Sequence, residues 1–195
     1  MSPLDPSALD RIAAALCVRT PVPAARDEPF HEAAVALVLH RGEHGLEALF
    51  IKRATREGDP WSGQIALPGG RRNPGETLRD TAMRETHEET GVPLSEIGTL
   101  LGELDELRPR TPVLPPIIVR PYVFVVPHRP ALVLSDEVAE AFWAPLDVIF
   151  DDATRTEITI SVPGFHATRP AIGVNGHVIW GMTEHILRTF EQILR

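Results

Sequence analysis

The sequence contains a single cysteine and no long apolar run, and each shortage excludes a class of protein. Cys17 is the only cysteine in 195 residues, so no internal disulfide can form. No segment approaches the roughly 18–20 apolar residues of a membrane-spanning helix, and the N-terminus lacks the basic and apolar regions of a secretory signal. We therefore expect a cytoplasmic protein without a membrane partner, in which Cys17 is a buried or half-buried packing residue, with a reactive thiol as the alternative.

The chain also has fewer basic residues than acidic residues. The chain has 19 lysines and arginines against 27 aspartates and glutamates, which gives a net charge of −8. Because nucleic-acid backbones are bound by basic surfaces, this balance argues against nucleic acid as a partner. The segment 52–72 is an exception, with five basic and two acidic residues. A basic segment beside an acidic one suits a site for a metal ion and phosphate.

The length and composition indicate a folded globular chain. It is 43% hydrophobic and 24% charged, and 195 residues suffice to bury a core. We expect an N-terminal helix and linker over residues 1–28, followed by one domain over residues 29–195. The apolar residues of the first helix recur at helical spacing: Leu9, Ile12, Ala13 and Leu16.

Nineteen prolines divide the rest of the chain into short segments. Strands are expected at 31–40, 46–54, 64–67, 99–107, 117–126 and 141–143, and in hairpins at 157–162 and 167–180 with a turn at Asn175-Gly176. Helices are expected at 78–90 and 182–194. A mixed sheet with helices packed on it is typical of an α/β or α+β fold.

The helix at 78–90 has clear end signals. Thr77 is a natural N-cap, with Asp80 three residues further along. Gly91 stands where a left-handed residue ends a helix, and Pro93 prevents continuation. The sequence therefore bounds this helix at both ends.

Three glutamates lie on one face of this helix. At about 100° per residue, Glu85, Glu88 and Glu89 fall within an arc of roughly 100°. Arg84 is expected to point partly aside, so that a hard cation such as Mg²⁺ would relieve the repulsion between the carboxylates. The alternative is a solvated acidic face without a metal.

The segment around this helix resembles the Nudix box in residue type and spacing. The matching positions are Gly70, Glu76, Arg84, Glu85, Glu88, Glu89, Gly91 and Val92. One position departs from the pattern, because Thr86 stands where the box has a bulky apolar residue. The branched shape is kept, so we expect slightly altered packing and unchanged chemistry.

The resemblance implies the Nudix fold, a mixed β-sheet between helices. It also implies a Mg²⁺ ion, with Mn²⁺ as a substitute, held by Glu85, Glu88 and Glu89 with the Gly70 carbonyl. Arg84 would orient the glutamates, and Glu76 would support the loop before the helix by pairing with a basic group.

The implied reaction is water attack on phosphorus in a nucleoside diphosphate derivative. Catalysis of this kind consists mainly of positioning and charge neutralisation, with a general base to deprotonate the water. Family members take that base from the box, here Glu85 or Glu88, or from a distal loop glutamate. Glu137 is the distal candidate, with a plain surface role as the alternative, and Glu103 and Glu106 are weaker candidates.

Further segments resemble the coenzyme A pyrophosphatase branch, whose products are 3′-phosphoadenosine 5′-phosphate and phosphopantetheine. They are Phe50–Arg53, Trp61–Gly70, Asp136–Pro145 and Ile179–Thr183. Arg53 and Arg71 are candidates for phosphate binding, and Trp61 either stacks on a base or serves as ordinary packing. The loop between Arg53 and Gly63 departs from the branch pattern, which leaves the substrate open.

Two other functions remain as alternatives. One is the same chemistry on ADP-ribose, a dinucleoside polyphosphate or a nucleoside triphosphate. The other is a catalytically silent domain that binds a nucleotide, which the three retained box glutamates disfavour. The helix at 182–194 is either core or part of a homodimer interface.

Overall fold

The computed structural model describes residues 8–27, 29–43, 45–59, 61–109, 116–162 and 165–195. Its helices are α1 (Ala8–Cys17), α2 (Leu78–Thr90), α3 (Leu94–Ile97), α4 (Leu146–Ile149) and α5 (Met182–Leu194), with a short 3-10 helix at Asp152–Thr154. The strands of the larger sheet are β1 (His31–Gly42), β2 (Gly45–Arg53), β3 (Ile65–Ala66), β4 (Gly69–Arg71), β5 (Thr99–Glu103), β6 (Ile117–Val126) and β7 (Val138–Pro145). A second sheet contains β8 (Arg155–Val162), β9 (Phe165–Val174) and β10 (His177–Trp180).

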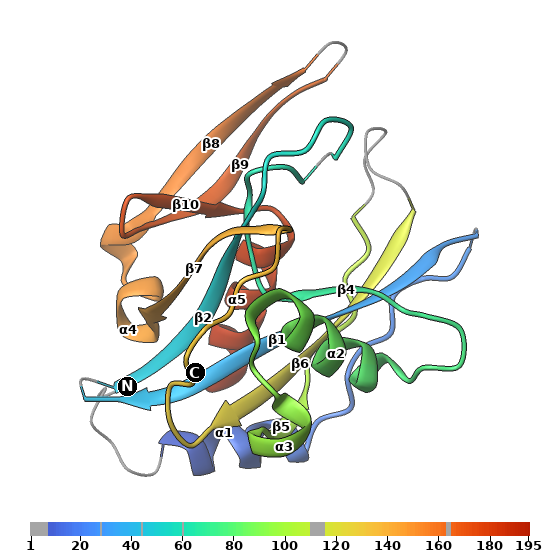
Figure 1. The fold of residues 1–195 in the computed structure, drawn as a ribbon. Coiled ribbons are helices and arrows are strands. Elements are labelled where there is room, and N and C mark those ends of the chain that lie inside the picture. Colours follow the sequence, from blue (N-terminus) through green and yellow to red (C-terminus); the bar gives the residue numbers. More distant parts are fainter. Residues whose placement is uncertain (1–7, 28, 44, 60, 110–115, 163–164) are drawn as a thin grey trace.

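The larger sheet is mixed. Its main order is β3-β2-β1-β6-β5, with β7 paired to β2 and β4 paired to β1. β1 and β6 run parallel along ten residue pairs, whereas β1 is antiparallel to both β2 and β4. β1 pairs with β2 through its last four residues, 39–42, and with β4 at residues 33–35, so its partner changes along its length. The second sheet has the order β10-β9-β8 and projects away from the first (Figure 1).

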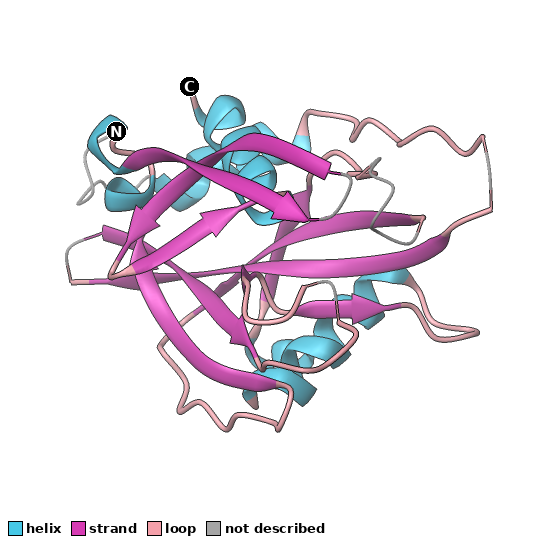
Figure 2. Cartoon of the chain, turned by 90° about the horizontal axis from the view of Figure 1, so that it is seen from above, coloured by secondary structure: helices cyan, strands magenta, loops and turns pink. Residues whose placement is uncertain are grey.

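Helices cover both faces of the larger sheet. Because side chains alternate along a strand, Leu37 and Leu39 of β1 pack in one cluster with buried residues of α1 and α5. Ala36 and Val38 face the other way, into a cluster with residues of α2 and α3. Figures 1 and 2 show helices on either side of the central strands. The expected mixed sheet between helices is confirmed.

The first helix is part of this core. Ala8, Ile12 and Leu16 of α1 are buried in the same cluster as Phe190 of α5. The packing on β5 is close, because a Cβ added to Gly102 would lie 2.6 Å from the Cβ of Leu16. Cys17 follows Leu16 by one position, about 100° around the helix, and is exposed. The prediction that Cys17 packs in the interior is therefore wrong.

The predicted helices and strands agree with the structure where the spacing of apolar side chains determines the type of element. The helices at 78–90 and 182–194 and the strand at 117–126 have the predicted bounds. The strand expected at 99–107 ends at Glu103, and the one expected at 141–143 extends over 138–145. β4, α3 and α4 were not predicted, since each is four residues or fewer and lacks a periodic pattern. No helix in the described ranges is long and apolar enough to cross a membrane.

Candidate active site

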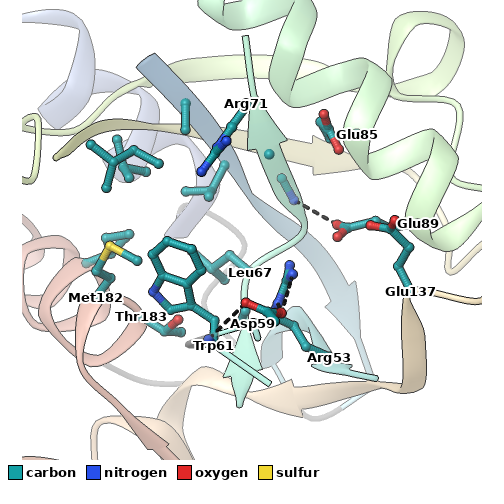
Figure 3. Close-up of a pocket in the computed structure, with 18 residues that line it drawn as sticks. Arg53, Asp59, Trp61, Leu67, Arg71, Glu85, Glu89, Glu137, Met182 and Thr183 are labelled. Carbon is teal, nitrogen blue, oxygen red and sulfur yellow. Dashed lines mark hydrogen bonds and ion pairs between the residues drawn. The ribbon is translucent and has the colours of Figure 1, made fainter. Parts of the chain in front are cut away.

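A pocket of about 410 Å³ opens where β1 changes partner from β2 to β4. Its lining comes from β1 to β4, α2, β6, α5 and the loops after β2 and before β7 (Figure 3). The sequence-predicted site residues in the lining are Arg53, Trp61, Gly70, Arg71, Glu85, Glu89 and Glu137. Segments as far apart in the chain as Ala33 and Ile186 thus contribute to one cavity.

The α2 helix brings the box carboxylates to this pocket. Its first turn is capped by the Thr77 side chain, which accepts a hydrogen bond from the Asp80 N–H at 3.1 Å. It ends at Gly91, whose φ of 74° is left-handed. Thr81 and Ala82 are fully buried, and Glu85 and Glu89 extend from the same side of α2 toward Gly69 and Gly70 of β4. Both predicted caps are confirmed.

Thr86 occupies the interior of this helix–sheet contact. It is fully buried, and its hydroxyl donates to the Ala82 carbonyl at 2.7 Å. A polar group that bonds within its own helix requires no partner from the sheet. Threonine therefore fits at the position where the box has a bulky apolar residue.

Arg84 is the centre of an ion-pair network. Its guanidinium donates to Glu76 at 2.6 Å, to Glu85 at 2.7 Å and to Glu88 at 2.9 Å. It also donates to the Arg71 carbonyl at 3.1 Å, which ties α2 to β4. The expectation that Arg84 points partly aside is wrong, because its long side chain pairs with Glu85, the next residue, and with Glu88, one turn further along the helix. The network lowers the pKa of Glu76 to about 2, chiefly through the Arg84 hydrogen bond.

Glu89 is the most enclosed of the three box glutamates. It is 3% exposed, and its carboxylate accepts from the Gly69 N–H at 2.8 Å. Burial raises the pKa of Glu89 to about 8, because removing a carboxylate from water disfavours its charged form. Burial likewise raises the pKa of Glu85. Glu88 is exposed and lies outside the pocket lining.

The chemistry of these groups fits a hard divalent cation. Glu85 and Glu89 present carboxylate oxygens beside the backbone of Gly70, and such oxygens are the ligands that Mg²⁺ prefers. A Cβ at Gly70 would lie 2.4 Å from Cδ of Glu85, so a side chain there would displace this carboxylate from its present position. Within the described ranges, however, no three acidic, histidine or cysteine side chains are already grouped as a metal site. Arg84 and the Gly69 N–H engage the glutamates instead.

Glu137 lies beside Glu89, on the same side of the pocket as the box glutamates (Figure 3). Arg56 donates to its carboxylate at 2.9 Å, and the Ala54 N–H donates to its carbonyl at 2.8 Å. The weaker candidates lie elsewhere, because Glu103 and Glu106 pair with Arg120 away from the pocket lining. Of the three distal glutamates considered, only Glu137 is brought to the site.

The predicted substrate-binding residues form the other walls. Arg71 points into the pocket, and no hydrogen bond or ion pair engages its side chain within the described part of the chain. Arg53 is paired with Asp59 at 2.9 Å. The Trp61 ring lines the cavity between these groups and α5, and its indole N–H has no partner among the described residues.

Sequence reasoning missed part of the lining. Asp59 was not singled out, although it stands in the loop that departs from the branch pattern. Met182 and Thr183 belong to a segment noted for its resemblance and contribute from the start of α5. The remaining apolar lining residues lie in strands, between β3 and β4, and in α5, and carry no sequence signal beyond their hydrophobicity: Ala33, Val35, Ala66, Leu67, Ile117, Val119 and Ile186.

Comparisons with known proteins identify a family for the chain. The family described as NUDIX domain matches residues 29–161. The chain is 33% identical over 133 residues to the peroxisomal coenzyme A diphosphatase ndx-8 of Caenorhabditis elegans, covering 66% of this chain and 55% of that protein. It is 38% identical over 121 residues to the uncharacterized protein C14C4.10c of Schizosaccharomyces pombe, covering 57% and 36%.

A solved structure gives the same fold. The MutT/nudix family protein from Enterococcus faecalis superimposes with a TM-score of 0.59 at 23% identity, covering 88% of this chain and 64% of that one. The chain spans less than two thirds of the length of the curated relatives named above. The family match nevertheless covers more than half of this chain and includes the whole of α2. The chain belongs to the Nudix family.

Proposed function

We propose that the protein is a Mg²⁺-dependent hydrolase that cleaves the diphosphate linkage of a nucleoside diphosphate derivative. The observation that carries this proposal is the convergence of Glu85, Glu89 and Glu137 with Arg71 on one pocket. Carboxylates can hold the cation and activate water, while the arginine binds phosphate oxygens. Mn²⁺ is expected to substitute for Mg²⁺, because both accept oxygen ligands.

Glu85, Glu88 and Glu89, with the Gly70 carbonyl, would hold the metal. When bound, Mg²⁺ neutralises charge that develops on the phosphate oxygens. Glu88 is exposed and bonded to Arg84 at 2.9 Å, so its part in the site requires the side chain to turn from the arginine toward the pocket. Arg84 then keeps Glu76 and the α2–β4 connection in place.

Glu137 is the proposed general base, with Glu85 and Glu88 as box alternatives. A base takes a proton from water while the water oxygen forms a bond to phosphorus, and the bridging oxygen leaves with the electrons of the broken P–O bond. Glu137 lines the pocket beside Glu89, and Arg56 donates a hydrogen bond to its carboxylate. Arg71 would hold the phosphate that leaves.

Coenzyme A is the candidate substrate that sequence similarity favours, because the chain is 33% identical to a coenzyme A diphosphatase. ADP-ribose, dinucleoside polyphosphates and nucleoside triphosphates are the alternatives. The apolar lining from β6 and α5 offers a surface for an uncharged group attached to the diphosphate. A silent nucleotide-binding domain is disfavoured by the intact set of box glutamates.

The proposal is tested by product analysis. The purified protein is incubated with Mg²⁺ and, separately, coenzyme A, ADP-ribose, NADH or diadenosine polyphosphates, and the products are separated by chromatography. We expect cleavage within the diphosphate of at least one compound, abolished by EDTA and restored by Mg²⁺ or Mn²⁺. Metal-independent binding of these compounds with no turnover would support the silent domain instead.

A further inference from the structure

Asp59 connects two walls of the pocket. Its Oδ2 accepts from the Arg53 guanidinium at 2.9 Å and 3.3 Å, and its Oδ1 accepts from the Trp61 N–H at 3.0 Å. Burial alone would raise the pKa of Asp59, but the Trp61 N–H and Arg53 outweigh it and hold the pKa below its ordinary value. Asp59 is therefore a charged partner of Arg53.

The loop around Asp59 is held in a defined shape. Its base is closed by a bond from the Arg53 N–H to the Gln64 carbonyl at 3.0 Å. Inside it, the Ser62 N–H donates to the Asp59 carbonyl at 3.1 Å, and the Arg56 N–H donates to the Ser62 hydroxyl at 2.9 Å. Because these bonds fix the backbone, Arg53, Asp59 and Trp61 are presented to the pocket as one unit.

The pairing of Arg53 with Asp59 affects which of the two pocket arginines is available to bind an anionic group of a substrate. The Arg53 and Asp59 side chains are 27% and 17% exposed, so their pairing takes place in a partly desolvated position. An anionic group that approaches Arg53 meets the Asp59 carboxylate and must compete with it. Arg71, on the opposite wall, has no such competitor within the described ranges.

We propose that Asp59 is a specificity-determining residue that selects against substrates with a phosphate monoester in addition to the diphosphate. The inference rests on the proposed function, and among its candidate substrates it ranks those without a ribose phosphate, such as ADP-ribose and dinucleoside polyphosphates, ahead of coenzyme A. With the diphosphate between Arg71 and the box glutamates, a base stacked on Trp61 places its ribose beside the Arg53–Asp59 pair. A further phosphate on that ribose is repelled by Asp59 and finds Arg53 already neutralised.

Coenzyme A and 3′-dephospho-coenzyme A form a matched test, because they differ only in the ribose phosphate. We expect the wild-type protein to have the higher kcat/KM for the dephospho compound. The substitution Asp59→Asn keeps an oxygen that can accept from the Trp61 N–H but removes the charge. It should shift the ratio of the two kcat/KM values toward coenzyme A by about tenfold, the size expected of one charged hydrogen bond.

The control is Asp147→Asn, which makes the same change in net charge at an exposed position of α4 outside the pocket lining. It should leave the ratio within about twofold of wild type, since a screened distant charge acts weakly. Circular dichroism of each variant checks the fold. A wild-type preference for coenzyme A, or an unchanged ratio in folded Asp59→Asn, would overturn the proposal.

A binding experiment distinguishes failure of the Asp59 proposal from failure of the proposed function. If neither compound is cleaved with Mg²⁺ present, the proposed hydrolysis of these two substrates is wrong. The role of Asp59 is then tested by measuring the affinities of adenosine 5′-monophosphate and adenosine 3′,5′-bisphosphate by calorimetry. We expect Asp59→Asn to gain affinity for the bisphosphate relative to the monophosphate. Equal relative affinities in wild type and variant count against Asp59 as the discriminating residue.

Discussion

At the scale of single residues, the box glutamates differ more in environment than their spacing suggests. Glu89 is buried and bonded to a backbone N–H, Glu85 is half-buried, and Glu88 is exposed and paired with Arg84. Helical spacing correctly identified the face that they share. It did not distinguish their burial, because burial is decided by β4 and the loop before β7 rather than by the helix.

Replacing Glu89 with Gln tests its proposed role as a metal ligand. The amide keeps the size of the side chain and can still accept from the Gly69 N–H, so the fold should persist. Loss of one charged metal ligand should lower kcat by about 10²–10³-fold, the range found when one stabilising group is removed from an active site. Steady-state kinetics and far-UV circular dichroism measure the two effects. Full activity with unchanged Mg²⁺ dependence would contradict the metal assignment.

Glu76 has a different and acid-sensitive contribution. Its pKa is lowered to about 2 from an ordinary value of 4.5, so the folded state keeps the charged form that Arg84 stabilises. This stabilisation is fully present above about pH 4.5 and is lost as the pH falls toward 2. We expect Glu76→Gln to be less stable than wild type at pH 6, with a difference that shrinks in acid. Urea unfolding with EDTA at several pH values measures it.

If the Glu76→Gln difference were instead constant between pH 6 and pH 3, the carboxylate would not owe its stabilising effect to its charge. Glu157→Gln is a suitable control, because Glu157 is an exposed residue of β8 outside the pocket lining. Its substitution should change stability little at any pH in this range.

At the scale of elements, the ends of α2 were predictable because they are marked by side chains. Thr77 and Gly91 each have a local structural role, and no distant contact is needed to infer it. β4 was not predictable, since its Gly69-Gly70 pair has no side-chain pattern and forms a strand only by pairing with β1. The pocket depends on such pairings, which explains why its glutamates were found and much of its apolar lining was not.

Thr77→Ala should destabilise the protein by about 1 kcal/mol, because it leaves the Asp80 N–H without its capping acceptor. Chemical denaturation at neutral pH measures the change. Thr156→Ala, at an exposed position in β8, serves as a matched control and should have a smaller effect. An equal loss in both variants would show that the Thr77 hydroxyl does not act as a cap.

At the scale of the whole molecule, ion pairs connect the segment after α1 to the residues that follow β5. Arg19 pairs with Asp105 at 2.5 Å, and Arg26 pairs with Glu106 at 2.8 Å. The sequence predicted that α1 is an amphipathic helix. It did not predict which elements α1 packs against or the ion pairs that follow it, because these depend on residues far away in the sequence. The division at residue 29 stays a prediction, as do the homodimer and the cytoplasmic location.

Ile12→Ala tests how much α1 contributes. Ile12 is fully buried against the central core, so its truncation should lower the free energy of unfolding by about 2–5 kcal/mol. Val18→Ala is the matched control, because Val18 is 86% exposed just beyond α1. The control should change stability by less than about 0.5 kcal/mol. A small effect of Ile12→Ala would mean that α1 adds little to the core.

The parallel pairing of β1 with β6 has a consequence for the kinetics of folding. The two strands meet along ten residue pairs, with partners 86 positions apart in the sequence. Closing so large a loop costs entropy before any of these contacts can form, and topologies rich in such contacts fold slowly. The pocket is lined from both strands, so it cannot exist until that closure is complete. Refolding from denaturant should therefore restore ligand binding only in the phase that joins β1 to β6.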